Sequence, residues 1–118
     1  MKTIHVTIPD IPPSVNTYWK TARNKSTGRP MRYLSERAKA WKQLVNATCK
    51  KNILKGKLSM EIIVYLPDNR RRDVDNMTKG VLDSLEKVFY EDDKQIWDLK
   101  ISKKIEGKPR TEIKLEQV

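Results

Sequence analysis

The feature that most limits the fold is a strand pattern that leads directly into a helix pattern. Residues 58–66 place an apolar side chain at every second position, which predicts a half-buried strand. Residues 67–69, Pro-Asp-Asn, follow as a turn signal. Apolar residues then recur at three- and four-residue spacing from Met77 to Phe89, which predicts a helix that begins near Asp73 and buries one face.

The junction between these two elements is strongly charged. Residues 70–75, Arg-Arg-Arg-Asp-Val-Asp, set three cations against two carboxylates. On a regular helix Asp73 and Asp75 would point to nearly opposite sides, so they converge only if Asp73 lies before the first turn, where an acid is a favoured N-cap. Lys79 is four residues beyond Asp75 and falls on the same helix face.

A second acidic group, Glu91-Asp92-Asp93, follows the helix pattern. If the chain turns back there, a third carboxylate can join Asp73 and Asp75. Clustered carboxylates repel one another, and a hard divalent cation such as Mg²⁺ or Mn²⁺ relieves that repulsion. Such an ion beside Lys79 suits phosphoryl transfer, because the ion activates water and the lysine neutralises developing charge.

A purely structural interpretation accounts for the same residues. Asp73 can cap the helix, Asp75 can pair with Lys79, and residues 91–93 can form a solvated turn, since caps and ion pairs of this kind are common. An Asp-x-Asp pattern is a weak signal by itself. From the residues alone, both interpretations remain open.

The charge is divided unevenly along the chain. The 118 residues have a net charge of +10, with 13 Lys and Arg against 2 Asp and Glu in residues 1–60, and 12 against 13 in residues 61–118. The first half therefore supplies a positive field, and the second half holds the candidate site. This segregation favours a polyanionic partner, most simply nucleic acid, over a charge that serves only solubility.

Several classes of protein are disfavoured by composition. Cys49 has no second cysteine to pair with, and one histidine cannot complete a zinc site. No apolar run reaches the roughly 20 residues that span a membrane, and the first residues lack a signal-peptide core. We therefore expect a cytoplasmic protein with no membrane association.

The remaining patterns predict one α+β domain over residues 1–118. Residues 2–8 alternate as a strand, and residues 35–51 form a helix capped by Ser35. Residues 95–105 and 110–115 are expected to pair as a hairpin. The order strand, helix, strand, helix, strand, strand implies two helices packed on one mixed four-stranded sheet.

Two N-terminal segments are candidates for DNA contact. The loop at residues 12–20 mixes amide, aromatic and basic groups, and within it Asn16 and Tyr18 are candidates for either a structural or a DNA-facing role. Residues 20–32 are polar, basic and aperiodic, which predicts a mobile segment. It offers five cations to a phosphate backbone: Lys20, Arg23, Lys25, Arg29 and Arg32.

Three motifs together resemble a known family. They are residues 12–18 (Pro-Pro-Ser-Val-Asn-Thr-Tyr), residues 67–76 together with Lys79, and Asp92-Asp93. In this order and approximate spacing, the chain resembles the RusA endodeoxyribonucleases, Holliday junction resolvases of phages and prophages. The central Arg-Arg-Asp-x-Asp-Asn-x-x-Lys pattern is far more specific than Asp-x-Asp alone.

The resemblance implies a homodimer that binds four-way DNA junctions and nicks two strands symmetrically, using Mg²⁺ or Mn²⁺ and no small-molecule cofactor. By resemblance, the metal-binding aspartates are Asp73, Asp75 and Asp93, with Asp92 the alternative to Asp93, and Lys79 is the essential lysine. We expect at least one of Arg70, Arg71 and Arg72 to contact a phosphate. The rival hypotheses are a non-catalytic DNA-binding or architectural protein and a nuclease for other branched DNA or RNA.

Overall fold

A central strand and the helix that follows it organise the fold. The computed structural model describes residues 2–118. Strand β4 (Leu58–Leu66) leads through residues 67–73 into helix α2 (Val74–Leu85), as the sequence predicted. Alternate residues of β4 are buried along its length because one of its faces meets the helices.

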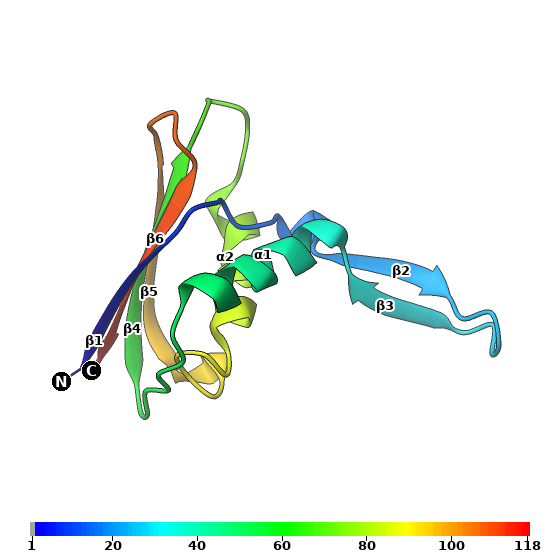
Figure 1. Ribbon diagram of the computed structural model, residues 1–118, viewed down its shortest axis with the longest axis horizontal. Coiled ribbons are helices and arrows are strands. Elements are labelled where there is room, and N and C mark those ends of the chain that lie inside the picture. Colours follow the sequence, from blue (N-terminus) through cyan, green and yellow to red (C-terminus); the bar gives the residue numbers. More distant parts are fainter. Residues whose placement is uncertain (1) are drawn as a thin grey trace.

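The other elements surround this pair. The chain runs through strand β1 (Thr3–Ile8), a short 3₁₀ helix η1 (Val15–Thr17), strands β2 (Trp19–Arg23) and β3 (Pro30–Leu34), and helix α1 (Glu36–Thr48) before β4. After α2 come the 3₁₀ helix η2 (Asp93–Gln95) and strands β5 (Ile96–Ile105) and β6 (Arg110–Gln117). Both helices lie on the same side of the sheet (Figure 1). The predicted architecture of two helices on a mixed four-stranded sheet is confirmed.

The order of strands in the sheet differs from the prediction. The sheet runs β1-β6-β4-β5, with β4 parallel to β5 and antiparallel to β6. The predicted hairpin between β5 and β6 is therefore wrong, because β4 lies between them. The connection crosses the end of β4, where the Glu106 backbone N–H donates to the Leu66 carbonyl at 3.0 Å. The most buried strand takes a central position, and proximity in sequence does not decide the pairing.

Residues 20–32, which the sequence predicted to be a mobile segment, also differ from the prediction. Strands β2 and β3 pair antiparallel from Trp19 opposite Leu34 to Arg23 opposite Pro30, so much of residues 20–32 forms a hairpin. The Asn24 side chain closes the turn by accepting from the backbone N–H groups of Ser26 and Thr27. Nearly all side chains of this hairpin are exposed, which explains why no hydrophobic periodicity marked it.

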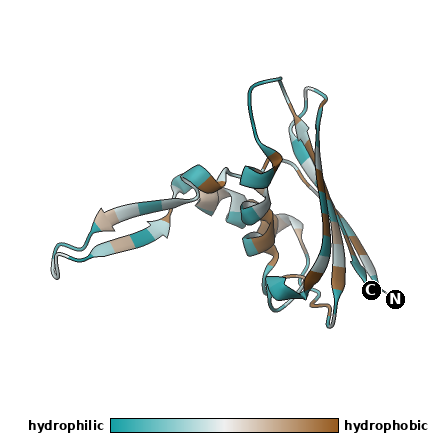
Figure 2. Cartoon of the chain, turned by 180° about the vertical axis from the view of Figure 1, so that it is seen from behind, coloured by the Kyte–Doolittle hydropathy of each residue, from teal (hydrophilic) through white to brown (hydrophobic). Residues whose placement is uncertain are grey.

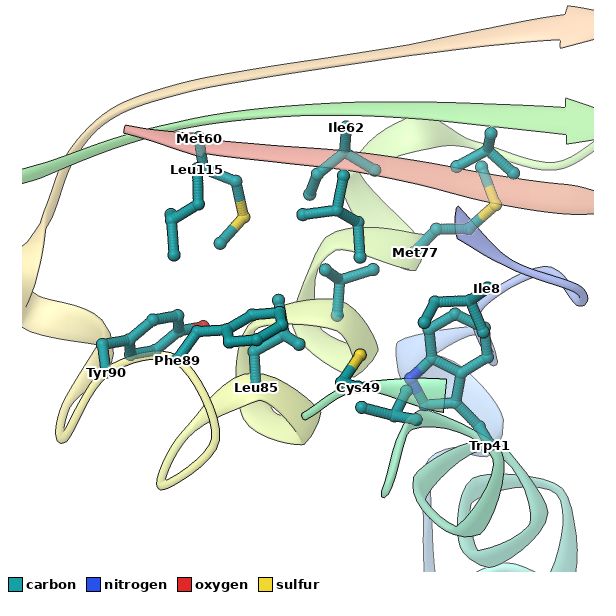
Figure 3. Close-up of a cluster of buried hydrophobic side chains, with 14 of the residues drawn as sticks. Ile8, Trp41, Cys49, Met60, Ile62, Met77, Leu85, Phe89, Tyr90 and Leu115 are labelled. Carbon is teal, nitrogen blue, oxygen red and sulfur yellow. The ribbon is translucent and has the colours of Figure 1, made fainter. Parts of the chain in front are cut away.

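The core lies between the sheet and the two helices. Met60, Ile62 and Leu115 extend from the sheet toward Met77 and Leu85 of α2 (Figure 3). The hairpin extends away from this core as an arm (Figures 1 and 2). None of the helices within residues 2–118 is sufficiently long and apolar to cross a bilayer.

The two helices are joined by a polar contact inside the core. The Trp41 indole N–H of α1 donates to the Gly80 carbonyl at 3.2 Å and to Ser84 Oγ at 3.0 Å on α2. Ser84 in turn donates to the Val81 carbonyl at 3.0 Å. Because Trp41 is fully buried, these bonds fix the position of α2, the helix that presents the candidate site.

Candidate active site on helix α2

The N-terminus of α2 presents two carboxylates that are not used for capping. Asp73 is the N-cap residue with extended backbone angles, but its side chain makes no capping hydrogen bond. One carboxylate oxygen lies 3.6 Å from Nε of Arg71, in a half-exposed position. Asp75 is exposed in the first turn. The predicted helix start is confirmed, while the alternative role of the Asp73 carboxylate as a cap is not realised.

Lys79 lies between the N-terminal and C-terminal carboxylates of α2. Its ammonium lies 3.4 Å from a carboxylate oxygen of Asp83, one turn further along α2. Among the ion pairs of residues 2–118, the pairing of Asp75 with Lys79 that the structural interpretation required does not occur. Asp75, Lys79 and Asp83 are spaced four residues apart and therefore form a row along one helix face.

The C-terminal end of α2 holds a compact acidic cluster. Asp83, Glu86 and Asp93 each place a carboxylate oxygen within 4.8 Å of the other two. The chain returns to α2 at η2, where the Asp93 backbone N–H donates to Glu86 Oε1 at 3.2 Å. Burial, together with the neighbouring charges of Glu86 and Asp92, raises the pKa of Asp93, and Lys79 partly offsets the rise. This arrangement favours a bound cation over three free carboxylates.

The structure does not bring the three predicted metal ligands to one point. Within residues 2–118, the one set of three acidic groups close enough to share an ion is Asp83, Glu86 and Asp93, without Asp73 or Asp75. The chain does turn back after the helix, as expected, but Asp93 meets the C-terminal end of α2. The convergence of Asp73, Asp75 and Asp93 therefore remains a prediction.

The structure separates Asp92 from Asp93. The Asp92 carboxylate caps η2 by accepting from the Lys94 backbone N–H at 2.9 Å, and this bond lowers the pKa of Asp92. Its carboxylate is thereby committed to the turn. Asp93 instead faces Asp83 and Glu86, so it is the member of the pair that is available to an ion.

A cleft beside the N-terminus of α2 joins the first two sequence motifs, residues 12–18 and residues 67–76. It has a volume of about 420 Å³ and is lined by residues of the loop before η1 and by Arg71, Arg72, Asp73 and Asn76. The loop approaches α2 closely at Gly80, where a Cβ atom would lie 3.1 Å from the Pro13 ring. A side chain at this position would push the loop away, so glycine permits the cleft to form.

The two N-terminal candidates in this loop have different positions. Asn16 is exposed and lines the cleft, where it can reach a bound phosphate. Tyr18 is fully buried, and so the structural role that the sequence left open applies to it. The expectation that Tyr18 contacts DNA is wrong, because its ring packs into the body of the protein.

The three arginines before α2 are held differently. Arg72 is bonded to Asp68 at 2.9 Å with a side chain that is 19% exposed, and Arg70 lies 3.6 Å from the same carboxylate. Their pairing with Asp68 braces the turn. The Arg71 side chain is 90% exposed at the rim of the cleft, which makes it the arginine most accessible to a phosphate.

The hairpin arm presents the predicted cationic side chains to solvent. All five are exposed: Lys20, Arg23, Lys25, Arg29 and Arg32. Arg32 stacks over the half-exposed Trp19 ring, with its guanidinium carbon 4.8 Å from the ring centroid. An arm with cations along both strands has the charge to follow a phosphate backbone.

Sequence reasoning missed several residues of this region. Arg37 on α1 lines the cleft and is held by Asp10 at 3.0 Å and by the Ile11 carbonyl. Asp83 and Glu86 complete the acidic cluster. The four-residue spacing from Lys79 could have identified Asp83, whereas no local signal identifies Arg37, because the loop that it meets lies more than twenty residues away in sequence.

Comparison with known proteins decides the family. The family described as Endodeoxyribonuclease RusA matches residues 10–116. The chain belongs to the RusA endodeoxyribonuclease family. This assignment agrees with the resemblance of the sequence motifs.

Individual RusA relatives match over most of the chain. A protein of Enterobacteria phage HK97, named crossover junction endodeoxyribonuclease, is 36% identical over 95 residues, which is 76% of this chain and 74% of that protein. Proteins of the same name from Enterobacteria phage 82 and Escherichia coli are 33% and 32% identical over 108 residues, which is 87% of this chain and 84% of each relative.

Proposed function

We propose that this RusA-family endodeoxyribonuclease cuts four-way DNA junctions in a metal-dependent reaction, with paired symmetric nicks, in DNA recombination and repair. The relatives named crossover junction endodeoxyribonucleases support the substrate. The observation that carries the chemistry is the α2 row, in which Lys79 lies between Asp75 and Asp83. Asp73, at the start of the same helix, lines a cleft together with Arg71 and Arg72.

The proposed catalytic residues are Asp73, Asp75, Lys79 and Asp93. Carboxylate oxygens are the hard ligands that Mg²⁺ prefers, and Mn²⁺ can substitute, so these side chains are of the type that would hold a divalent cation once they converge on it. When bound, the cation would polarise the scissile phosphate and lower the pKa of its water. Lys79 would stabilise negative charge on the phosphate or on the leaving oxygen, since its ammonium is already held on this face of α2.

DNA would be held by groups outside the acidic row. Asn16 and Arg71 at the cleft and the cations of the hairpin arm are the proposed phosphate contacts. A homodimer suits this function because a four-way junction offers two equivalent strands, and two symmetric sites can cut both.

An assay that offers several nucleic acids tests the proposal. The purified protein, with Mg²⁺ or Mn²⁺ present or removed by chelation, is given labelled four-way junctions, flaps, duplex DNA and RNA. Metal-dependent symmetric nicks confined to the junction are expected. Cleavage of flaps or RNA in preference would indicate a different branched substrate, and binding without any cleavage would indicate an architectural protein.

A further inference from the structure

An irregularity at the start of strand β5 exposes a tryptophan. Strand β5 forms one edge of the sheet, with β4 as its neighbour. Ile96 pairs with Leu58, and Asp98 pairs with the next residue of β4, so Trp97 is an extra residue without a partner on β4. Extra residues of this kind redirect a side chain and are common at sheet edges and beside functional sites. Trp97 is 68% exposed, more than any other aromatic residue within residues 2–118.

Lysines border the exposed ring. The Lys57 ammonium lies 4.2 Å from the centroid of the Trp97 ring, which is a cation–π distance. Lys94 lines the same open hollow of about 460 Å³ beside the ring, and Lys55 precedes Lys57 by two residues. None of the ion pairs within residues 2–118 involves these three lysines. Carboxylates of the described chain therefore do not neutralise the positive charge around Trp97.

Hydrogen bonds hold the surroundings of the ring in place. The Gln95 side-chain amide donates to the carbonyls of Leu54 and Gly56, both at 3.0 Å, and ties η2 to the loop before β4. The Val118 backbone N–H donates to the Lys57 carbonyl at 3.0 Å, at the end of the same loop. These bonds order the groups around the ring in advance, which lowers the entropic cost of binding a partner there.

An exposed aromatic face bordered by lysines has the two properties that suit single-stranded nucleic acid. A base of any identity can stack on the ring, while lysines neutralise the adjacent phosphates. Within a duplex the neighbouring base pairs cover the faces of each base, so an unpaired base is required. A peptide or a second copy of the chain could also cover Trp97, but neither would need the unneutralised lysines. The charge therefore favours DNA as the occupant.

We propose that Trp97 is a stacking platform for an unpaired base of the DNA substrate, with Lys55, Lys57 and Lys94 binding the adjacent phosphates. This inference rests on the proposed branched substrate, because a base at a branch point can leave the stack. The 3₁₀ helix η2 carries Asp93 of the proposed cleavage set and leads directly into β5. A base stacked on Trp97 would thus be held near the proposed cleavage site.

Fluorescence anisotropy of labelled oligo(dT), titrated with the full chain in EDTA, tests the platform. Trp97→Ala should raise the Kd about 5- to 100-fold, the range expected for the loss of one stacked base. Trp97→Leu keeps apolar volume without an aromatic face and should bind as weakly, whereas Trp97→Phe should recover most of the affinity. Ile105→Ala, at an exposed apolar residue at the other end of β5, should leave the Kd unchanged. The affinity for duplex DNA should be the same in Trp97→Ala and the wild-type protein.

Two further readouts separate the phosphate contacts from the stacking. Lys57→Gln and Lys94→Gln should each weaken oligo(dT) binding and reduce the slope of log binding constant against log salt concentration by about 0.7, the value for one phosphate on a single strand. Stacking of a base on Trp97 should quench its emission. Oligo(dT) should therefore quench the wild-type protein more than Trp97→Phe, in which only Trp19 and Trp41 emit.

Three results would overturn the platform. They are an unchanged Kd for oligo(dT) in both Trp97→Ala and Trp97→Leu, an equal loss of affinity for duplex DNA, and a sedimentation change in Trp97→Ala that places the ring in a subunit interface. Circular dichroism checks the fold of each variant, and Trp97→Leu decides the question if Trp97→Ala does not fold.

The platform and the proposed cleavage can fail separately, because oligo(dT) binding in EDTA requires no cleavage. Junction nicking by the wild-type protein, together with unchanged oligo(dT) binding in the Trp97 variants, would refute only the platform. The expected loss of oligo(dT) binding in those variants, without junction nicking by the wild-type protein, would refute only the proposed cleavage.

Discussion

Two buried tyrosines should respond to the same substitution with opposite signs. Tyr18 and Tyr90 are both fully buried. The Tyr90 hydroxyl donates to the Leu82 carbonyl at 2.7 Å, whereas the Tyr18 hydroxyl has no partner within residues 2–118. Phenylalanine removes the hydroxyl and keeps the ring, so each substitution isolates one polar group.

The magnitudes follow from the cost of a buried polar group without a partner, which is about 1–3 kcal/mol. Tyr18→Phe removes such a group and should raise the free energy of unfolding of the metal-free protein by about 1 kcal/mol, or the Tm by about 4 °C. Tyr90→Phe breaks a hydrogen bond and leaves the Leu82 carbonyl without it, which should lower the free energy of unfolding by about 1–3 kcal/mol.

Urea denaturation followed by circular dichroism, in buffer with EDTA, measures both values. The m-values of the two variants should match the wild-type value, so that the change in midpoint reports stability. A Tyr18→Phe variant that is destabilised as much as Tyr90→Phe would show that the Tyr18 hydroxyl already has a partner. The prediction that this hydroxyl is a buried polar group without a partner would then be refuted.

Three further predictions test the cleft, the core and the free thiol. Arg71→Ala should weaken junction binding and reduce the slope of log binding constant against log salt concentration by about 1. Arg72→Ala should leave this slope unchanged, because Arg72 is bonded to Asp68. Fluorescence anisotropy at several salt concentrations measures both slopes. Trp41→Phe removes the donor to α2 and should lower the free energy of unfolding by about 2 kcal/mol in urea denaturation. Burial raises the pKa of Cys49 to about 11, so at pH 8 it should react with a thiol reagent roughly 100-fold more slowly than an exposed cysteine, and equal rates would contradict its burial.

The sequence predicted the elements whose side chains alternate between core and solvent. The strand at residues 58–66 and the start of α2 after Asp73 agree with the structure, because one face of each is buried. The Ser35 cap is also confirmed, since its hydroxyl accepts from the Ala38 N–H at 3.1 Å. These features depend on local spacing, which a sequence displays directly.

The errors arose where pairing or position depends on distant residues. The β2–β3 hairpin buries almost nothing, so it shows no periodicity, and it is held by backbone hydrogen bonds that sequence does not display. The insertion of β4 between β5 and β6 is a property of the whole sheet. In both cases the sequence pattern describes the strand but not its neighbour.

The site was predictable in part for the same reason. The position of Asp75 and Lys79 on one helix face follows from helical spacing. In the structure, however, Lys79 pairs with Asp83. Asp83 and Glu86 lie near Asp93, where the chain returns to α2. Which acidic residues form a cluster depends on where η2 packs against α2. The spacing of the acids along the sequence does not determine that position.

A plasmid with an extruded cruciform tests the central claim most directly, because it counts paired cuts in one molecule. With Mg²⁺, the wild-type protein should convert the supercoiled plasmid to the linear form, because two symmetric nicks across the junction cut both strands of the plasmid. Asp75→Asn should bind the cruciform and leave it uncut. Accumulation of nicked circles without linear product would contradict paired cleavage, and cutting that persists in EDTA or in Asp75→Asn would contradict a metal-dependent site on α2.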